Sequence, residues 1–272
     1  MRLINYPERT MRSRSKGKCM NKNYRFSLWL FVSLIFALCS HTASSQAATE
    51  GVHWAYEGIN GPERWGELSP EFIQCKVGLN QSPIDITDSI EADLPPLVLD
   101  YTSKTIDLTN NGHTAQVNVE PGSYLRVEGE EFELLQFHVH VPSEHRVNGK
   151  PFLLEVHYVH QNARGQLAVV GVLYREGQDH PKLTRYLLEV PTEIGKPVKF
   201  EVPLGNLRVV EADKAYYRYN GSLTTPPCTE GVRWYVLKEV MTVSKKRRDV
   251  FNKLIGDDAR GPQPINARPV LR

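Results

Sequence analysis

The chain has 272 residues, of which 40% are hydrophobic and 24% charged, a composition that is ordinary for a folded protein of one large or two small domains. Its 33 basic and 31 acidic residues leave a net charge of +2 at pH 7. Much of the positive charge lies in a leader at the N-terminus, so the overall balance gives no argument for nucleic-acid binding.

The first 47 residues have the order of a secretory signal peptide. Eight Lys and Arg side chains lead into the apolar run SLWLFVSLIFALC at 27–39, and small residues follow, with Ser45–Ala47 as a candidate cleavage site. The apolar run is short for a membrane span, although an uncleaved anchor stays open as an alternative. Translation starts at either Met1 or Met20. We therefore expect a periplasmic or secreted protein, and loss of the leader, whose charge is +7, leaves a charge near −5.

After residue 50, short runs rich in Val, Ile, Leu and Tyr alternate with turns, which predicts an antiparallel β architecture. No repeat and no linker divides these runs, so we expect a leader at 1–47 and one domain at 48–272. The predicted strands are LVLDY (97–101), TIDLT (105–109), AQVNV (115–119), SYLRVEG (123–129), EFELLQFHVHV (131–141), PFLLEVHYVHQ (151–161), LAVVGVLY (167–174), VVEADKAYYRY (209–219) and GVRWYVLKEV (231–240).

Turns and helices are marked by their own signals. The sequences Asn-Asn-Gly at 110–112 and Asn-Gly at 148–149 predict turns between strands. Two stretches favour helices, at 179–190 and from 244, and Ser244 is a suitable N-cap for the second one. The expected fold class is therefore mainly β, with a minor share of short helices.

Three of the chain's nine histidines lie within eight positions of one predicted strand and the loop after it. On a strand, His138 and His140 point to one face, while Phe137 and Val139 point to the other. Such a pair either places two imidazoles about one metal ion or is a half-buried polar pair without a ligand. With Glu144 the pair also resembles half of a cupin motif for iron or manganese, but no second cupin box follows.

The next predicted strand carries Glu155 and His157 on one face. If the two strands pair, His138, His140 and His157 converge. Three neutral imidazoles with an open fourth position are typical of catalytic zinc, whereas structural zinc is usually closed by four protein ligands. Gln136 and Glu155 each lie two residues before a histidine. They either accept the second N–H of an imidazole or are ordinary polar residues of a wet sheet face.

Removal of the leader takes away two of the four cysteines, Cys19 and Cys39. The remaining pair, Cys75 and Cys228, predicts a disulfide in an oxidising compartment, and two buried free thiols are the alternative.

The segment 217–240 contains the run GSLTTPP, which a β core does not require. Together with QFHVH, SEH and LEVHYVH in this order, it makes the chain resemble an α-class carbonic anhydrase of the bacterial, secreted type. The resemblance extends through HWAYEGINGPERW (53–65), NQSPIDI (80–86), NNGH (110–113) and NARPV (266–270). It implies a single domain with a large, twisted, mostly antiparallel sheet of about ten strands and short peripheral helices.

The resemblance also implies a function and a set of site residues. The function is that of a zinc lyase that hydrates CO₂ reversibly to bicarbonate and a proton, by attack of a hydroxide generated at Zn²⁺ and proton export through a histidine. The implied zinc ligands are His138, His140 and His157, supported by Gln136, Glu155 and the Asn266 backbone, and the catalytic residues are Thr224, Glu144 and the proton shuttle His113. The implied substrate pocket comprises Val159, Val169, Leu223, Thr225, Val232 and Trp234, the water network Tyr56, Asn111 and Gln116, and the disulfide Cys75 and Cys228.

The partners implied are CO₂ and bicarbonate, with inhibitory anions and sulfonamides, and neither nucleic acid nor, after loss of the leader, a membrane. The oligomeric state stays open, a homodimer being one alternative. A related binding protein without activity is a second hypothesis, which the presence of all three histidines with Glu144 and Thr224 disfavours. Because the chain stops at Arg272, where relatives continue, we expect a frayed C-terminal edge and doubtful support of the site by Asn266.

Overall fold

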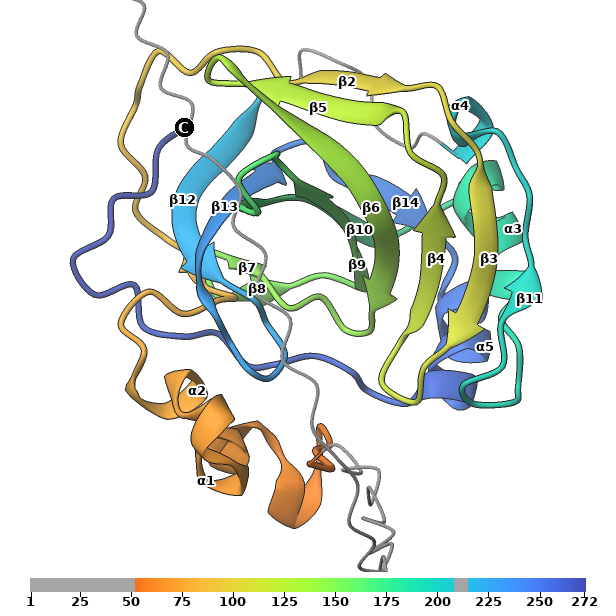
Figure 1. The fold of residues 1–272 in the computed structure, drawn as a ribbon, viewed down its shortest axis with the longest axis horizontal. Coiled ribbons are helices and arrows are strands. Elements are labelled where there is room, and N and C mark those ends of the chain that lie inside the picture. Colours follow the sequence, from red (N-terminus) through yellow and green to blue (C-terminus); the bar gives the residue numbers. More distant parts are fainter. Residues whose placement is uncertain (1–51, 208–214) are drawn as a thin grey trace, which may run out of the picture. The chain divides into compact units, whose positions relative to one another are not determined.

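The computed structural model describes residues 52–207 and 215–272, so the predicted leader and its cleavage site lie outside the described residues. Within them, the main element is a mixed sheet of 11 strands, and three short strands form a second sheet (Figure 1). The large sheet has the order β11-β3-β4-β6-β9-β10-β13-β12, with β14 paired to β10 and β2 joined to β6 through β5.

The strands are β1 (Asp85–Ile86), β2 (Val98–Tyr101), β3 (Thr105–Asn110), β4 (Ala115–Val119), β5 (Ser123–Val127), β6 (Glu130–His140), β7 (Arg146–Val147), β8 (Lys150–Pro151), β9 (Leu154–Gln161), β10 (Leu167–Glu176), β11 (Val198–Lys199), β12 (Tyr216–Ser222), β13 (Glu230–Leu237) and β14 (Met241–Val243). The helices are η1 (Gly58–Asn60), η2 (Pro62–Arg64), α1 (Trp65–Leu68), η3 (Pro70–Phe72), α2 (Gln74–Val77), α3 (Pro181–Leu188), α4 (Leu204–Leu207) and α5 (Lys245–Ile255).

The prediction of a mainly β fold with short helices is confirmed, and most strand pairs are antiparallel. One departure is central: β10 pairs in parallel with β13, with Val169 opposite Trp234, and in parallel with β14. Residue alternation locates a strand but does not give the direction of its neighbours, so the sequence could not show this. Helices α3 and α5 fall inside the two predicted helical stretches, and the Ser244 side chain accepts a hydrogen bond from the Arg247 N–H as the predicted N-cap.

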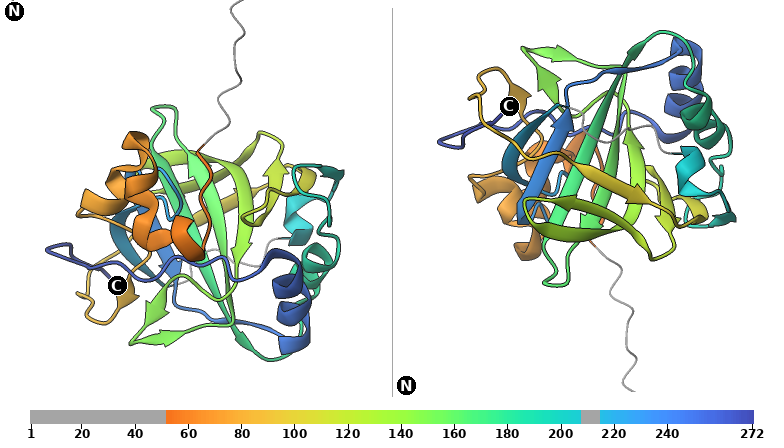
Figure 2. Two further views of the ribbon diagram at one scale, coloured as in Figure 1. Left: turned by 90° about the horizontal axis from the view of Figure 1, so that it is seen from below. Right: turned by 90° about the horizontal axis from the view of Figure 1, so that it is seen from above.

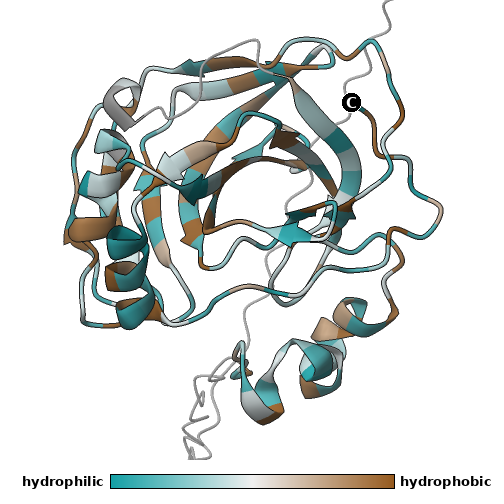
Figure 3. Ribbon diagram, turned by 180° about the vertical axis from the view of Figure 1, so that it is seen from behind, coloured by the Kyte–Doolittle hydropathy of each residue, from teal (hydrophilic) through white to brown (hydrophobic). Residues whose placement is uncertain are grey.

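The core lies on the side of the sheet that α3 and α5 cover. Figures 1 and 2 show these two helices side by side next to β3, β4 and β11. Phe137 and Val139 of β6 are buried there with Tyr186 of α3 and Phe251 of α5. Brown and teal bands alternate along several strands in Figure 3, whereas β10 is apolar almost throughout. The opposite side of β6 and β9 is thereby left for the polar residues that carry the site.

Two predicted turns differ in what they connect. The 110–112 turn joins β3 to β4 as expected, with Gly112 at a φ of 87° that favours glycine. The 148–149 turn instead joins β7 to β8, a small hairpin that lies in the second sheet with β1 and separates β6 from β9 along the chain.

Both ends of the described domain are fastened. The predicted disulfide is present between Cys75 and Cys228, with an S–S distance of 2.11 Å. The expectation of a frayed C-terminal edge is wrong, because Leu271 bridges to Arg218 of β12 and to Ile90, and Val270 is buried. No helix within the described ranges has the length and apolar character needed to span a membrane.

Candidate metal centre

The pairing of β6 with β9 brings the three predicted histidines together. His138 lies directly opposite His157 in the antiparallel register, and His140 follows on the same face of β6. One ring nitrogen of each imidazole lies within 4.8 Å of those of the other two. His140 and His157 are almost completely buried. The convergence expected from the alternation of residues is therefore what the fold produces.

The second nitrogens of His138 and His140 have hydrogen-bond partners, and that of His157 lies beside a carboxylate oxygen without a hydrogen bond of good geometry. His138 Nδ1 donates to Gln136 Oε1 at 2.8 Å, and His157 Nε2 lies 2.9 Å from Glu155 Oε1, as expected from the sequence. His140 Nδ1 donates to the backbone oxygen of Asp258 at 2.7 Å. Such partners fix the tautomer and the orientation of a metal-binding imidazole.

The expectation that the Asn266 backbone supports the centre is wrong. The carbonyl on His140 belongs to Asp258, whereas Asn266 is exposed and its side chain donates to the Leu79 oxygen at 2.7 Å. Both residues lie in the irregular segment after α5, where no periodicity in the sequence identifies the carbonyl that turns inward. Asp258 also accepts a hydrogen bond from the Val141 N–H through its own side chain, at 2.6 Å.

The other ring nitrogen of each imidazole is available to bind a metal ion. His140 Nε2 is buried and has no hydrogen-bond partner among the described residues. A buried polar atom left unpaired costs about 1–3 kcal/mol, a cost that a bond to a metal would offset. His138 and His157 each keep one nitrogen free of the partners named above, and three imidazole donors suit zinc. The donor set therefore fits a metal with three nitrogen ligands.

The electrostatics of the centre favour a cation. Burial, followed by the charges of His140 and His157, lowers the pKa of His138 well below its usual value, and burial also lowers the pKa of His157. Burial acts in the same direction on His140, but the carboxylates of Glu144 and Asp258 outweigh it and raise the pKa of this imidazole. Two of the imidazoles are thus kept in the neutral form that binds a metal, and the buried carboxylates lie beside the third, where they favour a cation.

Glu144 lies at the metal-facing side of the imidazoles. Its Oε1 accepts a hydrogen bond from the Arg260 N–H at 2.9 Å, and its Oε2 lies 3.5 Å from His140 Nε2 and 3.8 Å from His157 Nδ1. Thr224 is buried in the loop after β12, yet no hydrogen bond joins it to Glu144 within the described chain. Glu144 Oε2 has no hydrogen-bond partner there either, so one buried carboxylate oxygen is left to accept one.

The structure contains a buried chain of hydrogen bonds next to Glu155 that the sequence did not predict. Glu155 Oε1 lies 2.8 Å from His145 Nδ1, and the carboxylate can only accept, so this nitrogen carries the proton. His145 Nε2 in turn lies 2.7 Å from the Tyr219 hydroxyl oxygen, which shares a hydrogen bond of 2.9 Å with Ser82 Oγ. The only signal in the sequence is His145 itself, in the SEH motif, whose partners are separated from it by up to 74 residues.

An apolar wall borders His157. The Trp234 ring lies 4.9 Å from the His157 ring, centre to centre, at an angle of 76°. Register places Val159 of β9 opposite Val169 of β10, and Val169 opposite Trp234 of β13. These side chains belong to one cluster, which also includes the predicted pocket residues Leu223 and Val232. Thr225 is half-buried in the adjoining loop, where its oxygen accepts the Cys228 N–H.

The predicted shuttle His113 is stacked on an aromatic ring. Its imidazole lies 3.7 Å from the Trp54 ring, centre to centre, with an angle of 6° between the planes. Both line a cavity of about 280 Å³ together with His53, Tyr56 and Asp257. Burial, and then the charge of His53, lowers the pKa of His113. Trp54 has no role in our sequence analysis, although it lies inside one of the family motifs.

The predicted water network divides into different roles. Gln116 lies in register with His138 and donates to Asn118 at 2.8 Å, which places it beside a candidate metal-binding histidine. Asn111 instead shapes the turn, because its side-chain oxygen accepts the N–H groups of His113 and Thr114. The Tyr56 hydroxyl is buried, and burial, with the charge of Glu144, raises its pKa well above the usual value.

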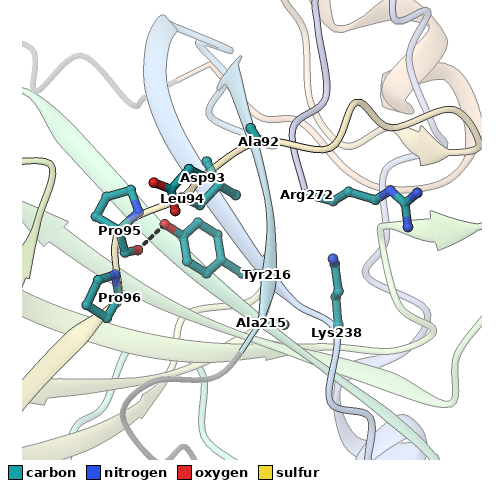
Figure 4. A pocket seen from close by; sticks show the side chains of 9 residues that line it. All are labelled: Ala92, Asp93, Leu94, Pro95, Pro96, Ala215, Tyr216, Lys238 and Arg272. Carbon is teal, nitrogen blue, oxygen red and sulfur yellow. Dashed lines mark hydrogen bonds between the residues drawn. The ribbon is translucent and has the colours of Figure 1, made fainter.

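A second cavity, of about 360 Å³, shares no residue with the histidine centre. Figure 4 shows Tyr216 donating to the Pro95 oxygen, at 2.5 Å, inside it. Lys238 and Arg272 also line this cavity.

Two buried imidazoles and a half-buried one, bordered by an apolar wall on a large β-sheet, define a protein with a site able to hold a metal ion. The model of the family described as eukaryotic-type carbonic anhydrase matches residues 60–272. The carbonic anhydrase of Pectobacterium carotovorum is 40% identical over 243 residues, covering 89% of this chain and 98% of that protein. The carbonic anhydrase of Neisseria gonorrhoeae is 40% identical over 242 residues, covering 88% and 96%.

Among solved structures, the α-carbonic anhydrase of Thermovibrio ammonificans in complex with the inhibitor sulfanilamide is similar, with a TM-score of 0.78. It is 44% identical, and the match covers 82% of this chain and all of that one. The chain belongs to the α-class carbonic anhydrase family, a family of metalloenzymes that hydrate CO₂.

Proposed function

We propose that this protein hydrates CO₂ reversibly to bicarbonate and a proton at the centre formed by His138, His140 and His157, with zinc as the metal. The observation that supports this most is that the two nitrogens of each imidazole have different surroundings. One nitrogen meets a partner from Gln136, Asp258 or Glu155, and the other lies close to those of the neighbouring rings.

Zinc is the metal that this donor set favours. Three nitrogen ligands without a thiolate leave a position open for substrate, and both cysteines of the described chain are used in the disulfide. Zinc bound there would act as a Lewis acid that lowers the pKa of water from 15.7 to about 7. The residues of the chain then have three tasks, which are to aim the water, to admit CO₂ and to remove a proton.

We assign the aiming of the water to Thr224 and Glu144. A threonine hydroxyl has one proton. When Thr224 donates it to Glu144 Oε2, the carboxylate oxygen that lacks a hydrogen-bond partner in the described chain, the Thr224 oxygen can only accept. It then holds the attacking water through hydrogen and leaves a lone pair of that water to face CO₂. The Arg260 N–H on Glu144 Oε1 supports this by keeping the carboxylate in place.

The apolar wall and the histidine-lined cavity take the other two tasks. CO₂ carries no charge and little polarity, so a surface of Val159, Val169, Leu223, Val232 and Trp234 beside His157 suits it. His113 passes the proton to solvent. Its half-exposed ring and its position in a cavity that contains Tyr56 suit a relay between a buried centre and the surface.

The same family membership supports three further proposals. Sulfonamides are expected to inhibit this enzyme, as sulfanilamide is an inhibitor of the Thermovibrio ammonificans enzyme. Residues 1–47 act as a signal peptide ahead of the catalytic domain 48–272, which places the enzyme in the periplasm or outside the cell. A disulfide between Cys75 and Cys228 agrees with such a compartment.

The test is stopped-flow CO₂ hydration by the purified protein, before and after removal of metal and after restoring zinc. We expect hydration that requires zinc and that His140→Asn abolishes together with stoichiometric zinc binding. His160→Gln is a matched control, because His160 is as deeply buried as His140, on the neighbouring strand β9, but bonds to Tyr101 and to the Ala168 oxygen instead. A folded, zinc-loaded wild-type protein without hydration activity would refute the proposed function.

A further inference from the structure

The segment Asp258–Arg260 touches the metal centre at two points although it belongs to no helix or strand. The Asp258 oxygen accepts from His140 Nδ1 at 2.7 Å, and the Arg260 N–H donates to Glu144 Oε1 at 2.9 Å. A backbone without regular structure is not held by a ladder of its own hydrogen bonds. At one end the Asp258 N–H donates to the Val141 backbone oxygen at 3.0 Å, and the rest of the segment is fixed by side chains.

One of these side chains is the guanidinium of Arg260, which is only 2% exposed. Its Nη1 donates to Gln81 Oε1 and to the Ser82 oxygen, both at 2.9 Å, and its Nη2 donates to the Cys75 oxygen at 3.2 Å. The guanidinium also lies over the Trp65 ring, 5.7 Å from its centre. All of these partners belong to residues 65–82, which precede the sheet in the chain.

Arg260 keeps its charge at neutral pH, since burial lowers its pKa only to about 10. Burying a charge is costly unless it is hydrogen-bonded, and here three oxygen acceptors and an aromatic face offset much of that cost, although Nε has no partner among the described residues. A planar guanidinium reaches several acceptors in fixed directions, which a lysine ammonium cannot reproduce. The residue is thus suited to hold one backbone segment rigidly against another.

We propose that Arg260 is a positioning residue of the metal centre. Anchored to residues 75–82, it keeps the Asp258 carbonyl on His140 and its own N–H on Glu144. Its removal weakens metal binding and the alignment of Glu144 even where the fold survives. This inference rests on the proposed metal site but not on the CO₂ reaction, because metal affinity alone tests it.

The experiment compares Arg260→Met and Arg260→Lys with wild type in the full chain. The zinc dissociation constant is measured by competition with a chelator, and the melting temperature of each metal-free protein is recorded. Arg233→Met is the matched control, because Arg233 also pairs with buried or half-buried groups, Glu130 at 2.7 Å and the Phe132 ring at 5.4 Å, but has no contact with the segment 258–260.

We expect Arg260→Met to raise the zinc dissociation constant by about 10- to 100-fold, the usual effect of losing support behind a metal ligand. Arg260→Lys should give a smaller increase, and Arg233→Met should stay within about twofold of wild type even if its melting temperature falls. Wild-type zinc affinity in Arg260→Met would overturn the proposal and leave Arg260 a purely structural residue.

If Arg260→Met does not fold, Arg260→Lys decides the question. A raised dissociation constant supports the positioning role, and an unchanged one overturns it. A wild-type protein that binds zinc tightly but does not hydrate CO₂ would refute the proposed function, while the affinities of the variants would still decide the role of Arg260.

Discussion

The environment of His113 determines what a single imidazole can do at the edge of the site. Its backbone N–H is held by the Asn111 side chain at 2.9 Å, and its ring is stacked on Trp54. The stack leaves the ring half-buried, and this burial lowers its pKa. At neutral pH the ring is therefore mostly neutral and ready to accept a proton, which it releases easily to a solvent base.

Replacing His113 with alanine tests this role. We expect His113→Ala to lower kcat for CO₂ hydration by about one to two orders of magnitude, at the low end of what a positioned acid–base group contributes, with kcat/KM little changed. Because a pKa below about 6.5 keeps the wild-type ring neutral, its kcat should fall only as the pH drops below that value. Stopped-flow measurements at several pH values, in dilute buffer, provide the check.

Imidazole added to the solution is the control, since a soluble base should restore much of the lost kcat. A Trp54→Phe variant keeps an aromatic partner and should remain close to wild type. An unchanged kcat for His113→Ala in dilute buffer would show that protons leave by another route.

At the scale of single elements, the residue pattern of β6 predicts the face of some side chains but not the register shift within the strand. Strict alternation over 137–141 predicts correctly that Phe137 and Val139 enter the core and that His138 and His140 face the site. The same rule applied from Leu134 fails, because the register shifts between Leu134 and Gln136. This bulge lets Leu134 and Phe137, three residues apart, enter the same core. An extra residue in one strand cannot be read from hydrophobicity alone.

The parts of the site that were missed share one physical reason. His138, His140 and His157 lie on two paired strands, where local alternation determines the face of each residue. Asp258, Arg260 and Tyr219 instead reach the centre from segments more than 70 residues away from their partners. Contacts of that kind depend on how loops return to the sheet. The parallel pairing of β10 with β13 was hidden for the same reason.

Gly171 of β10 provides a prediction at this scale. It lies opposite His157, and a Cβ atom built there would be 2.9 Å from Glu155 Oε1. Glu155 has little room to move, because its other oxygen accepts the backbone N–H groups of Glu144 and His145. We expect Gly171→Ala to push Glu155 away from His157 Nε2 and to raise the zinc dissociation constant about 10-fold or more. Chelator competition measures this change.

Gly261→Ala is the matched control, because a Cβ atom at Gly261 would have no other atom within 4 Å, and its zinc affinity should equal that of wild type. Equal affinities in both variants would mean that the strands can spread to admit the methyl group, and that Glu155 is not locked as the hydrogen bonds suggest.

At the scale of the whole described domain, the segment 75–82 links the chain's early residues to its late ones. Cys75 is bonded to Cys228, 153 residues later in the sequence. Gln81 donates to the Cys228 oxygen at 3.0 Å, and Glu230 accepts the Asn80 N–H at 2.6 Å. These contacts fasten the segment next to the loop that carries Thr224. Of these links, the disulfide alone is covalent, so it also restricts the conformations of the unfolded chain.

Removing the disulfide should therefore lower stability by an amount that depends on the length of the loop it closes. For a loop of about 150 residues, the chain-entropy estimate is about 5 kcal/mol of unfolding free energy at 25 °C. We expect the double variant Cys75→Ala/Cys228→Ala to lose approximately that amount in urea denaturation, and reduced wild type to behave alike. Reductant should leave the double variant unaffected. Because the effect arises in the unfolded state, the hydrogen bonds around 75–82 cannot replace it, and a loss below about 1 kcal/mol would contradict this account.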